Sequence, residues 1–401
     1  MSAILATERR PLRILLLGSV PLAEPWDGAD KNLARTLIAA DHHNTFLIQT
    51  AASADWATMP QVRPIPQRWA SPIPTARQKG RAFMFLLRHA HEIDLVHLVA
   101  SLSHPGWISV SGRLLAAWMR VLGLPLLHTA PSLGDHPLLR RHLPGDLTVV
   151  VSEHSRQRLH ALGKRHIMRI MPPIDLERLI PGPDSINLAA RLDLGLRSVL
   201  YPAHYGPDSG IEAMINALAT LPPGLSDTVL VLACRAQRGQ DLAAEERRML
   251  QYAQEQDVAR RIRVVGQVSA MPALISACSL TALVPVRMRS KMDLPLVLLE
   301  SLALGRPILI SDQEPMVEAL LGGGLAVPPG APDQLSAALI TLLGDERQRA
   351  AFARRGQDAV LTQCHPAQVV AEYQTLYWQA LANYSQRLGR LHWTSSSIPD
   401  E

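Results

Sequence analysis

The sequence is poor in the residues that cross-link small folds or bind metals. Its three cysteines, Cys234, Cys278 and Cys364, are far apart, and no two of them stand at the spacing of metal ligands. We therefore expect neither a disulfide framework nor a structural zinc site. This cysteine usage favours the cytoplasm.

Long apolar runs are also missing. The longest, such as Leu294–Leu299 and Ile14–Leu17, fall far short of the roughly 20 residues that cross a bilayer. The leader Met1–Pro11 carries Glu8, Arg9 and Arg10 with no long apolar segment after them. Neither a transmembrane helix nor a secretory signal is expected.

Aromatic residues are scarce, and the positive charge is unevenly spread. Four Phe and six Tyr leave little to stack on bases, and the basic residues form no single run, so nucleic acid is not an expected partner. Residues 1–185 hold 21 Lys+Arg against 14 Asp+Glu, whereas residues 186–401 hold 19 against 21. A basic first half suits a membrane surface, a lipid phosphate or an acidic glycan. A solvated, arginine-rich surface explains it equally well.

Length and periodicity indicate the fold class. The chain has 401 residues, of which 47% are hydrophobic and 19% charged, which is a globular composition too long for one core. Short apolar runs alternate with amphipathic stretches, as in parallel sheets covered by helices on both faces. The pattern predicts an α/β protein of two doubly wound domains.

The expected elements fall into two series. The first has strands at 13–20, 44–50, 94–100, 125–130, 147–152 and 166–172, with helices at 30–40, 77–92, 108–122 and 153–162. The second has strands at 198–203, 228–234, 262–268, 280–286, 307–311 and 325–327, with helices at 211–221, 243–256, 271–278, 295–304 and 316–321.

A proline-rich segment around Pro172, Pro173, Pro181 and Pro183 separates the two series and predicts a linker. We expect an N-terminal Rossmann-like domain at 1–180 and a C-terminal one at 181–366. A helix at 367–390 is expected to cross back to the first domain, followed by a tail at 391–401.

The segment from Lys291 to Asp312 carries the most chemical information. Pro295 near its start and Gly305 at its end delimit a helix of about ten residues by ordinary start and stop rules. The helix is apolar except for Glu300, and an unpaired buried carboxylate would cost several kcal/mol unless a group such as a sugar hydroxyl bound it. The free N–H groups at the helix start favour a phosphate. The alternative is a buried helix in which Glu300 pairs with an arginine elsewhere.

This segment resembles the donor-site motif of the large group of retaining GT-B glycosyltransferases known as glycosyl transferases group 1, of the family 4-like type. Those enzymes transfer sugars from UDP- or GDP-linked donors, and their motif has two glutamates around a helix start followed by Gly-Lys/Arg-Pro. Glu300 and Gly305-Arg306-Pro307 match, whereas Met292 stands at the first glutamate. Further segments resemble the family in the same order along the chain: 27–37, 94–97, 126–129, 150–155, 170–181 and 324–329.

The resemblance implies functional roles for particular residues. His128 and Asp293 are the catalytic candidates, with His128 near the transferred sugar, and His97 lies on the acceptor side. The donor-binding candidates are Gly28, His204, Ser209, Arg289, Lys291, Leu294, Pro295, Leu296 and Glu300. For His128 and His97 the alternative is a hydrogen-bonded core histidine, and for Gly28 a purely conformational role.

The departures from the family concern the donor diphosphate. Relatives clamp it with an arginine and a lysine at the positions of His204 and Ser209, so both fixed positive charges are lost here. Arg287, Arg289 and Lys291 are candidate replacements, and Asp293 is the candidate to take over the sugar contact of the missing glutamate.

The resemblance implies the GT-B fold, in which two doubly wound domains face a central cleft, with 1–180 on the acceptor side and 181–366 on the nucleotide-sugar side. It thus implies a glycosyltransferase that moves a sugar from a nucleotide-sugar donor to a glycan or lipid-linked acceptor with retention. No metal or other cofactor is expected, because a helix start and cations stabilise the diphosphate. The protein is expected in the cytoplasm, with peripheral contact to the inner membrane face open through the amphipathic stretch at 77–91. A solvated helix explains this stretch equally well. A catalytically inactive GT-B-like subunit or glycan-binding protein is the alternative. A nicotinamide-dependent oxidoreductase lacks its Gly-x-Gly-x-x-Gly turn.

Overall fold

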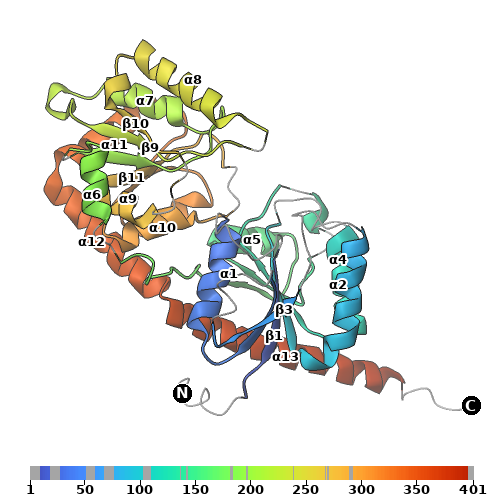
Figure 1. Cartoon of the computed structure of the whole chain (residues 1–401). Helices are drawn as coiled ribbons and strands as arrows, with labels where there is room; N and C mark the ends of the chain where they lie inside the picture. Colours follow the sequence, from blue (N-terminus) through green and yellow to red (C-terminus); the bar gives the residue numbers. More distant parts are fainter. Residues whose placement is uncertain are drawn as a thin grey trace, which may run out of the picture. The chain divides into compact units, whose positions relative to one another are not determined.

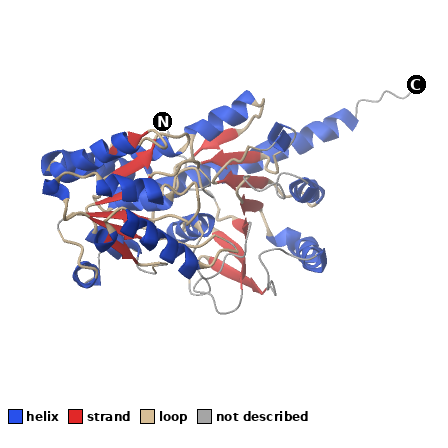
Figure 2. Ribbon diagram, turned by 90° about the horizontal axis from the view of Figure 1, so that it is seen from above, coloured by secondary structure: helices blue, strands red, loops and turns tan. Residues whose placement is uncertain are grey.

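A computed structural model describes residues 10–395, apart from 19–27, 51–58, 67–75, 103–109, 136, 141–142, 181–183, 196, 238, 267, 269–270 and 289–291. The chain divides into two domains. The N-terminal domain comprises Met1–Pro173, Lys291–Asp293 and Pro366–Glu401, and the C-terminal domain comprises Ile174–Ser290 and Leu294–His365. Each consists of a parallel sheet with helices packed beside it (Figures 1 and 2).

The sheet of the N-terminal domain has seven strands in the order β3-β2-β1-β4-β5-β6-β7. Its strands are β1 (Arg13–Gly18), β2 (Thr45–Thr50), β3 (Val62–Pro66), β4 (Leu95–Val99), β5 (Leu126–Ala130), β6 (Leu147–Val150) and β7 (Ile167–Arg169). Every residue of β4 and β5 is buried. This is the burial expected of central parallel strands that are covered on both faces.

Helices cover the two faces of this sheet. They are α1 (Ala29–Ala40), α2 (Ala76–His89), α4 (Val110–Val121), α5 (Glu153–Ala161) and α13 (Pro366–Ser395), with short 3₁₀ turns η2 (Ala90–Glu92) and η3 (Pro137–Arg140). Leu86 of α2 and Met119 of α4 share a buried cluster with Leu98 and Leu126, so both helices lie on one face. The neighbouring side chains His97 and Thr129 point to the other face, where they bond to tyrosines of α13.

The sheet of the C-terminal domain has six strands in the order β10-β9-β8-β11-β12-β13. These are β8 (Ser198–Tyr201), β9 (Val229–Leu232), β10 (Ile262–Val264), β11 (Leu280–Leu283), β12 (Ile308–Ser311) and β13 (Gly324–Val327). The helices are α6 (Asp184–Arg191), α7 (Ile211–Ala219), α8 (Leu242–Glu255), α9 (Met271–Ala277), α10 (Leu296–Ala303), α11 (Pro332–Gly344) and α12 (Glu346–Gln363), with 3₁₀ turns η4 (Pro223–Leu225), η5 (Ala259–Arg261) and η6 (Met316–Leu320).

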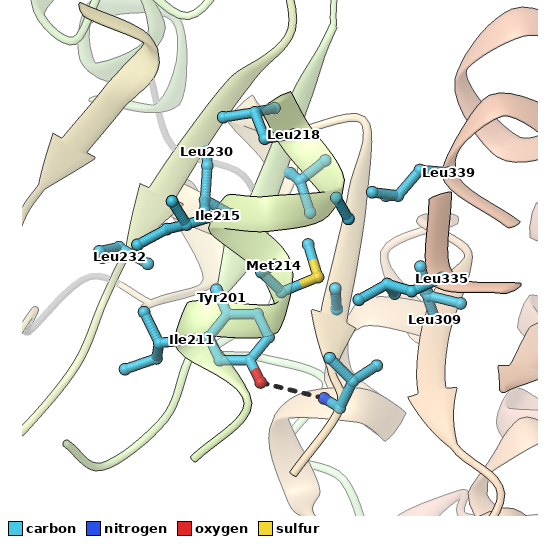
Figure 3. Close-up of a cluster of buried hydrophobic side chains, with 14 of the residues drawn as sticks. Tyr201, Ile211, Met214, Ile215, Leu218, Leu230, Leu232, Leu309, Leu335 and Leu339 are labelled. Atoms are coloured by element: carbon cyan, nitrogen blue, oxygen red, sulfur yellow. Dashed lines mark hydrogen bonds between the residues drawn. The ribbon is translucent and has the colours of Figure 1, made fainter. Parts of the chain in front are cut away.

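The core of the C-terminal domain fixes helix α7 against its sheet. Ile211, Met214, Ile215 and Leu218 recur at the helical spacing and are buried. They belong to one cluster with Leu230 and Leu232 of β9 and with Leu335 and Leu339 of α11 (Figure 3). Because α7 starts directly after the loop that follows β8, this packing also fixes the position of that loop.

The predicted fold class of two doubly wound α/β domains is confirmed. The first domain ends at Pro173 rather than at 180, since the N–H of Ile174 donates to the carbonyl of Cys364 in the second domain. The last helix, α13, belongs to the N-terminal domain. Within the described part of the chain, no helix combines the length and the apolarity needed to cross a bilayer.

Candidate functional site

The order of strands singles out one edge of the C-terminal sheet. From β8 the chain proceeds through β9 to β10 in one direction, whereas β11, β12 and β13 extend in the other. β8 and β11 are neighbours, so the loops after them leave the sheet toward opposite sides. Ligands of open α/β sheets bind at the carboxyl ends of strands at such a reversal. Within the described part of the C-terminal domain, the candidate site is therefore built from residues 202–210, 284–288 and 294–295.

Tyr201 at the end of β8 holds these two loops together. Its hydroxyl donates to the carbonyl of Ser209 at 2.6 Å and accepts the N–H of Val284 at 3.2 Å (Figure 3). The N–H of Val286 donates to the carbonyl of Asp208 at 2.9 Å. Burial raises the pKa of the Tyr201 phenol far above its usual value, so the hydroxyl stays protonated and continues to donate.

Gly210 makes this close approach of the two loops feasible. Its φ is +76°, and a Cβ at this position would lie 2.0 Å from the carbonyl oxygen of Val284 and 2.7 Å from the Tyr201 hydroxyl. Glycine is thus required here both by the backbone conformation and by space. The residue is also the N-cap of α7, and it provides no side-chain cap.

The loop after β12 is attached to the same place. The hydroxyl of Ser311 and the amide of Gln313 both donate to the carbonyl of Pro285, each at 2.7 Å. Three consecutive strand ends, those of β8, β11 and β12, are therefore tied to one another. These hydrogen bonds fix the relative positions of the three loops at this edge of the sheet.

Helix α10 starts at this edge without a capping side chain. Pro295 is its N-cap residue, and the N–H of Leu298 donates to the Pro295 carbonyl at 3.0 Å. Among the described residues the N–H groups of Leu296 and Val297 have no acceptor. Leu294 and Pro295 are buried and Leu296 is half-buried. Free N–H groups and the positive end of the helix dipole together suit an anion.

Glu300 is the one carboxylate of α10, and it is half-buried. No hydrogen bond to its side chain occurs among the described residues. Burial raises its pKa, while the positive charge of Arg178 lowers it and Asp175 raises it further; the net shift is upward. A carboxyl group with unused acceptor capacity in a poorly hydrated place can bind hydroxyl groups.

The two positions that carry an arginine and a lysine in the resembling family hold His204 and Ser209 here. His204 is exposed and forms a parallel bridge with Arg235 beyond the end of β9. The Ser209 hydroxyl makes only a long contact, 3.4 Å, with the N–H of Ile211. Arg287 is exposed in the loop after β11, whereas Arg289 and Lys291 lie outside the described residues.

Asp293 has a different environment from the one expected. Its side chain is 4% exposed and accepts hydrogen bonds from the hydroxyls of Ser152, at 2.6 Å, and Ser155 and from the N–H of Leu133. Burial raises the pKa of this carboxyl despite the serines. The carboxylate thereby attaches Asp293 to the N-terminal domain at the start of α5, and its expected sugar contact stays a prediction.

The two candidate histidines are fully buried in the N-terminal domain. The Nδ1 atom of His97 lies 3.0 Å from the Tyr377 hydroxyl, and its Nε2 atom lies 2.8 Å from the Thr129 hydroxyl. Both ring nitrogens are thus occupied by protein groups, and burial lowers the pKa of His97 to about 3. This is the environment of a hydrogen-bonded core histidine, and the expected acceptor-side role stays a prediction.

His128 is neutral as well, because burial lowers its pKa to about 4. Its Nε2 atom donates to the carbonyl of Ala100 at 2.8 Å, which leaves Nδ1 as an acceptor without a partner in the described part of the chain. The side chain is fully buried, and its expected place near the transferred sugar stays a prediction. The unpartnered Nδ1 atom is what distinguishes it from His97.

Gly28 is the buried N-cap residue of α1 and has an ordinary extended φ of −111°. Ser209, Leu294, Pro295, Leu296 and Glu300 belong to the C-terminal domain, whereas Asp293, His97, His128 and Gly28 belong to the N-terminal one. Sequence reasoning missed Tyr201 and Gly210. The sequence feature that could have indicated them is Gly210 itself, which follows the last residue of an apolar strand by nine residues and directly precedes a helix.

Comparisons with known proteins bear on the class and the fold of the chain. Residues 189–359 match the profile of the family described as "Glycosyl transferases group 1", and this range contains the whole candidate site. A search of curated proteins gives no match.

Several solved structures resemble the chain over nearly its full length. HepE from Anabaena in complex with UDP has a TM-score of 0.72 at 18% identity, covering 92% of this chain and 100% of its own. Sucrose-phosphate synthase from Thermosynechococcus elongatus has 0.71 at 20%, covering 94% and 100%. A glycosyltransferase from Rickettsia africae has 0.72 at 13%, covering 94% and 100%. The chain therefore has the GT-B fold of two Rossmann-like domains.

Proposed function

We propose that the protein is a glycosyltransferase that moves a sugar from a UDP- or GDP-linked donor to a glycan or lipid-linked acceptor with retention. The observation that carries the proposal is the uncapped start of α10 at the strand reversal, in the part of the chain that matches the group 1 profile. HepE crystals with UDP and with UDP-glucose support the choice of ligand class.

The proposal assigns the donor to named groups. The diphosphate binds the free N–H groups of Leu296 and Val297, with Ser209 and His204 beside it and with Arg287, Arg289 and Lys291 supplying charge. The carboxylate of Glu300 accepts hydrogen bonds from the ribose hydroxyls of the nucleotide. Fixed dipoles and cations stabilise the departing diphosphate, so the proposal needs no metal. Asp293 serves as a positioning residue that anchors the segment before α10.

Glu300 provides the direct test. Replacing Glu300 by Gln keeps the shape but removes the charge, and losing a charge-assisted hydrogen bond of about 2 kcal/mol should weaken UDP binding roughly 30-fold. Titration calorimetry with UDP, GDP and their glucose conjugates measures the effect. Glu255→Gln at the exposed end of α8 is the matched control and should leave the affinity unchanged.

Two outcomes would contradict the proposal. If the unmodified protein binds none of these nucleotides, the donor site does not exist in the proposed form. If Glu300→Gln binds UDP as tightly as the control variant, the ribose assignment is wrong. Donor binding that persists unchanged in a chelator supports the metal-free part of the proposal, whereas its loss in EDTA would overturn that part.

A second candidate function is a catalytically inactive subunit or glycan-binding protein. The neutral residues His204 and Ser209, at positions that carry cations in the resembling family, favour it. Product analysis with a radiolabelled donor distinguishes the two functions, because the inactive form releases neither free sugar nor a transfer product. The proposed cytoplasmic location and peripheral membrane contact can be tested separately by cell fractionation.

A further inference from the structure

Two neighbouring helices of the N-terminal domain contain no acidic residue. Across α2 (Ala76–His89) and α4 (Val110–Val121) there is no Asp or Glu, whereas the basic residues Arg77, Lys79, Arg81, Arg88, Arg113 and Arg120 all lie within them. Most surface helices intersperse both signs of charge. The absence of acids concentrates positive charge on this one side of the domain.

The same helices expose large apolar side chains. Val121 is 73% exposed, Met84 61% and Leu114 54%, and Leu87 and Trp118 are exposed as well. In the described part of the chain, ten large apolar residues are at least 37% exposed, and five of these ten lie on the two helices. Scattered exposed residues need no explanation, but apolar residues gathered on one face mark an interaction surface.

The exposed residues share the outward side of each helix. On α4 the apolar residues Leu114, Trp118 and Val121 recur at the helical spacing, while Ala116 and Met119 face the core. On α2 the exposed Arg77, Arg81 and Met84 follow the same spacing, while Leu86 is buried. Leu86 and Met119 belong to one cluster under both helices, so the two outward sides form part of one surface.

The exposed arginines of this surface are not neutralised by the protein. Among the described residues none of Arg77, Arg81, Arg88, Arg113 and Arg120 forms an ion pair, although other arginines of this domain do, such as Arg13 with Asp94. Arginine stems can lie along apolar material while their guanidinium groups bind phosphate oxygens. A basic surface with apolar residues between its charges fits an anionic phospholipid bilayer.

We propose that the outward surface of α2 and α4 docks the protein on an anionic phospholipid membrane, with Met84, Leu114, Trp118 and Val121 entering the interface and the arginines binding lipid phosphates. This deepens the membrane contact of the proposed function by naming its surface. Docking on lipid requires no nucleotide, so its test is independent of the donor site.

Co-sedimentation with vesicles tests the proposal on the full chain. The protein should pellet with vesicles of phosphatidylcholine mixed with phosphatidylglycerol and remain in the supernatant with phosphatidylcholine alone. Raising the salt concentration should weaken binding, because surface charges are screened. The double variants Arg81→Glu/Arg113→Glu and Leu114→Ser/Val121→Ser should each reduce binding about tenfold or more.

The matched control is Arg260→Glu/Ile340→Ser, which changes one exposed arginine and one exposed aliphatic residue of the C-terminal domain. It should bind vesicles like the unmodified protein. The proposal is overturned if the unmodified protein ignores anionic vesicles, or if all three variants bind them equally. It is also overturned if Leu114→Ser/Val121→Ser alters the sedimentation coefficient without vesicles, because the surface then joins protein chains. UDP titration of the same samples shows whether the proposed function fails separately.

Discussion

Two buried histidines give the N-terminal domain a pH dependence that is visible at the level of single residues. The ordinary pKa of His97 and His128 is 6.5, and burial lowers the values in the folded protein to about 3 and about 4. Below pH 6.5 the two imidazoles are therefore protonated in the unfolded chain but stay neutral in the folded domain. Stability is complete above pH 6.5 and falls as the pH drops toward 4, by about 1.4 kcal/mol per pH unit for each histidine.

Replacing His128 by Gln should remove half of this slope between pH 6.5 and 5, since the Gln amide can still donate to the Ala100 carbonyl. Urea unfolding followed by tryptophan fluorescence measures it. All seven tryptophans lie in Met1–Pro173 or Pro366–Glu401, so the signal reports the N-terminal domain alone. Equal slopes in the unmodified and His128→Gln proteins would show that His128 is already protonated in the folded state.

At the scale of single residues, the sequence could single out Glu300 as a candidate site residue, but it could not predict which residues surround Asp293. Glu300 stands out because it is the only charged residue in an apolar helix whose limits are set by Pro295 and Gly305. The partners of Asp293, in contrast, are Ser152 and Ser155, which are 141 and 138 residues away in the sequence. No local pattern specifies a pairing of that kind. The buried, bonded state of His97 was likewise decided by Tyr377, 280 residues away.

At the scale of elements, helix α13 is fastened to the N-terminal sheet by a buried polar cluster as well as by apolar contacts. Val369, Tyr373, Leu376, Tyr377 and Ala380 line its buried side. The hydroxyl of Tyr377 bonds to His97, and that of Tyr373 lies 3.1 Å from the Thr129 hydroxyl. Since a buried polar group without a partner is costly, each tyrosine hydroxyl fixes the position of the helix along the sheet.

Tyr377→Phe should therefore destabilise the N-terminal domain by about 1–3 kcal/mol, because it leaves a ring nitrogen of His97 unpaired in the core. The measurement is the midpoint of urea unfolding by tryptophan fluorescence. Tyr252→Phe removes a hydroxyl bonded to Asn216 in the C-terminal domain at 2.9 Å and should not move this midpoint. A Tyr377→Phe midpoint equal to that of the control would mean that the His97 contact adds nothing to stability.

Helices and strands with a clean periodicity could be predicted, and those without it could not. Each of the strands expected from an apolar run is present, because a strand buried on both faces has an almost wholly apolar sequence. The edge strand β3 was missed because Val62–Pro66 contains two prolines, which pair only where their missing N–H faces outward. The helix expected at 316–321 is the 3₁₀ turn η6, which begins directly after Pro315.

For the whole molecule, the chain path makes the N-terminal domain discontinuous. Its sheet is complete by β7, yet α13, which covers one face of that sheet, follows only after the entire C-terminal domain. The seven buried hydrophobic side chains of α13, at about 1.5–3 kcal/mol for each large one, contribute on the order of 10 kcal/mol. That equals the net stability of an ordinary domain, about 5–15 kcal/mol.

A fragment of residues 1–173 should consequently fail to fold, whereas the same fragment joined to residues 366–401 should fold. A short Gly-Ser linker suffices for the joined form, because the N–H of Ile174 lies 3.1 Å from the carbonyl oxygen of Cys364, so the chain enters and leaves the C-terminal domain at adjacent points. Circular dichroism and a cooperative urea transition in tryptophan fluorescence measure folding of both. The joined form carrying Tyr373→Ala and Tyr377→Ala is the control and should behave like residues 1–173 alone. A cooperative transition in the short fragment would show that the sheet is stable without α13, and the C-terminal helix would then have to serve some purpose other than completing the core.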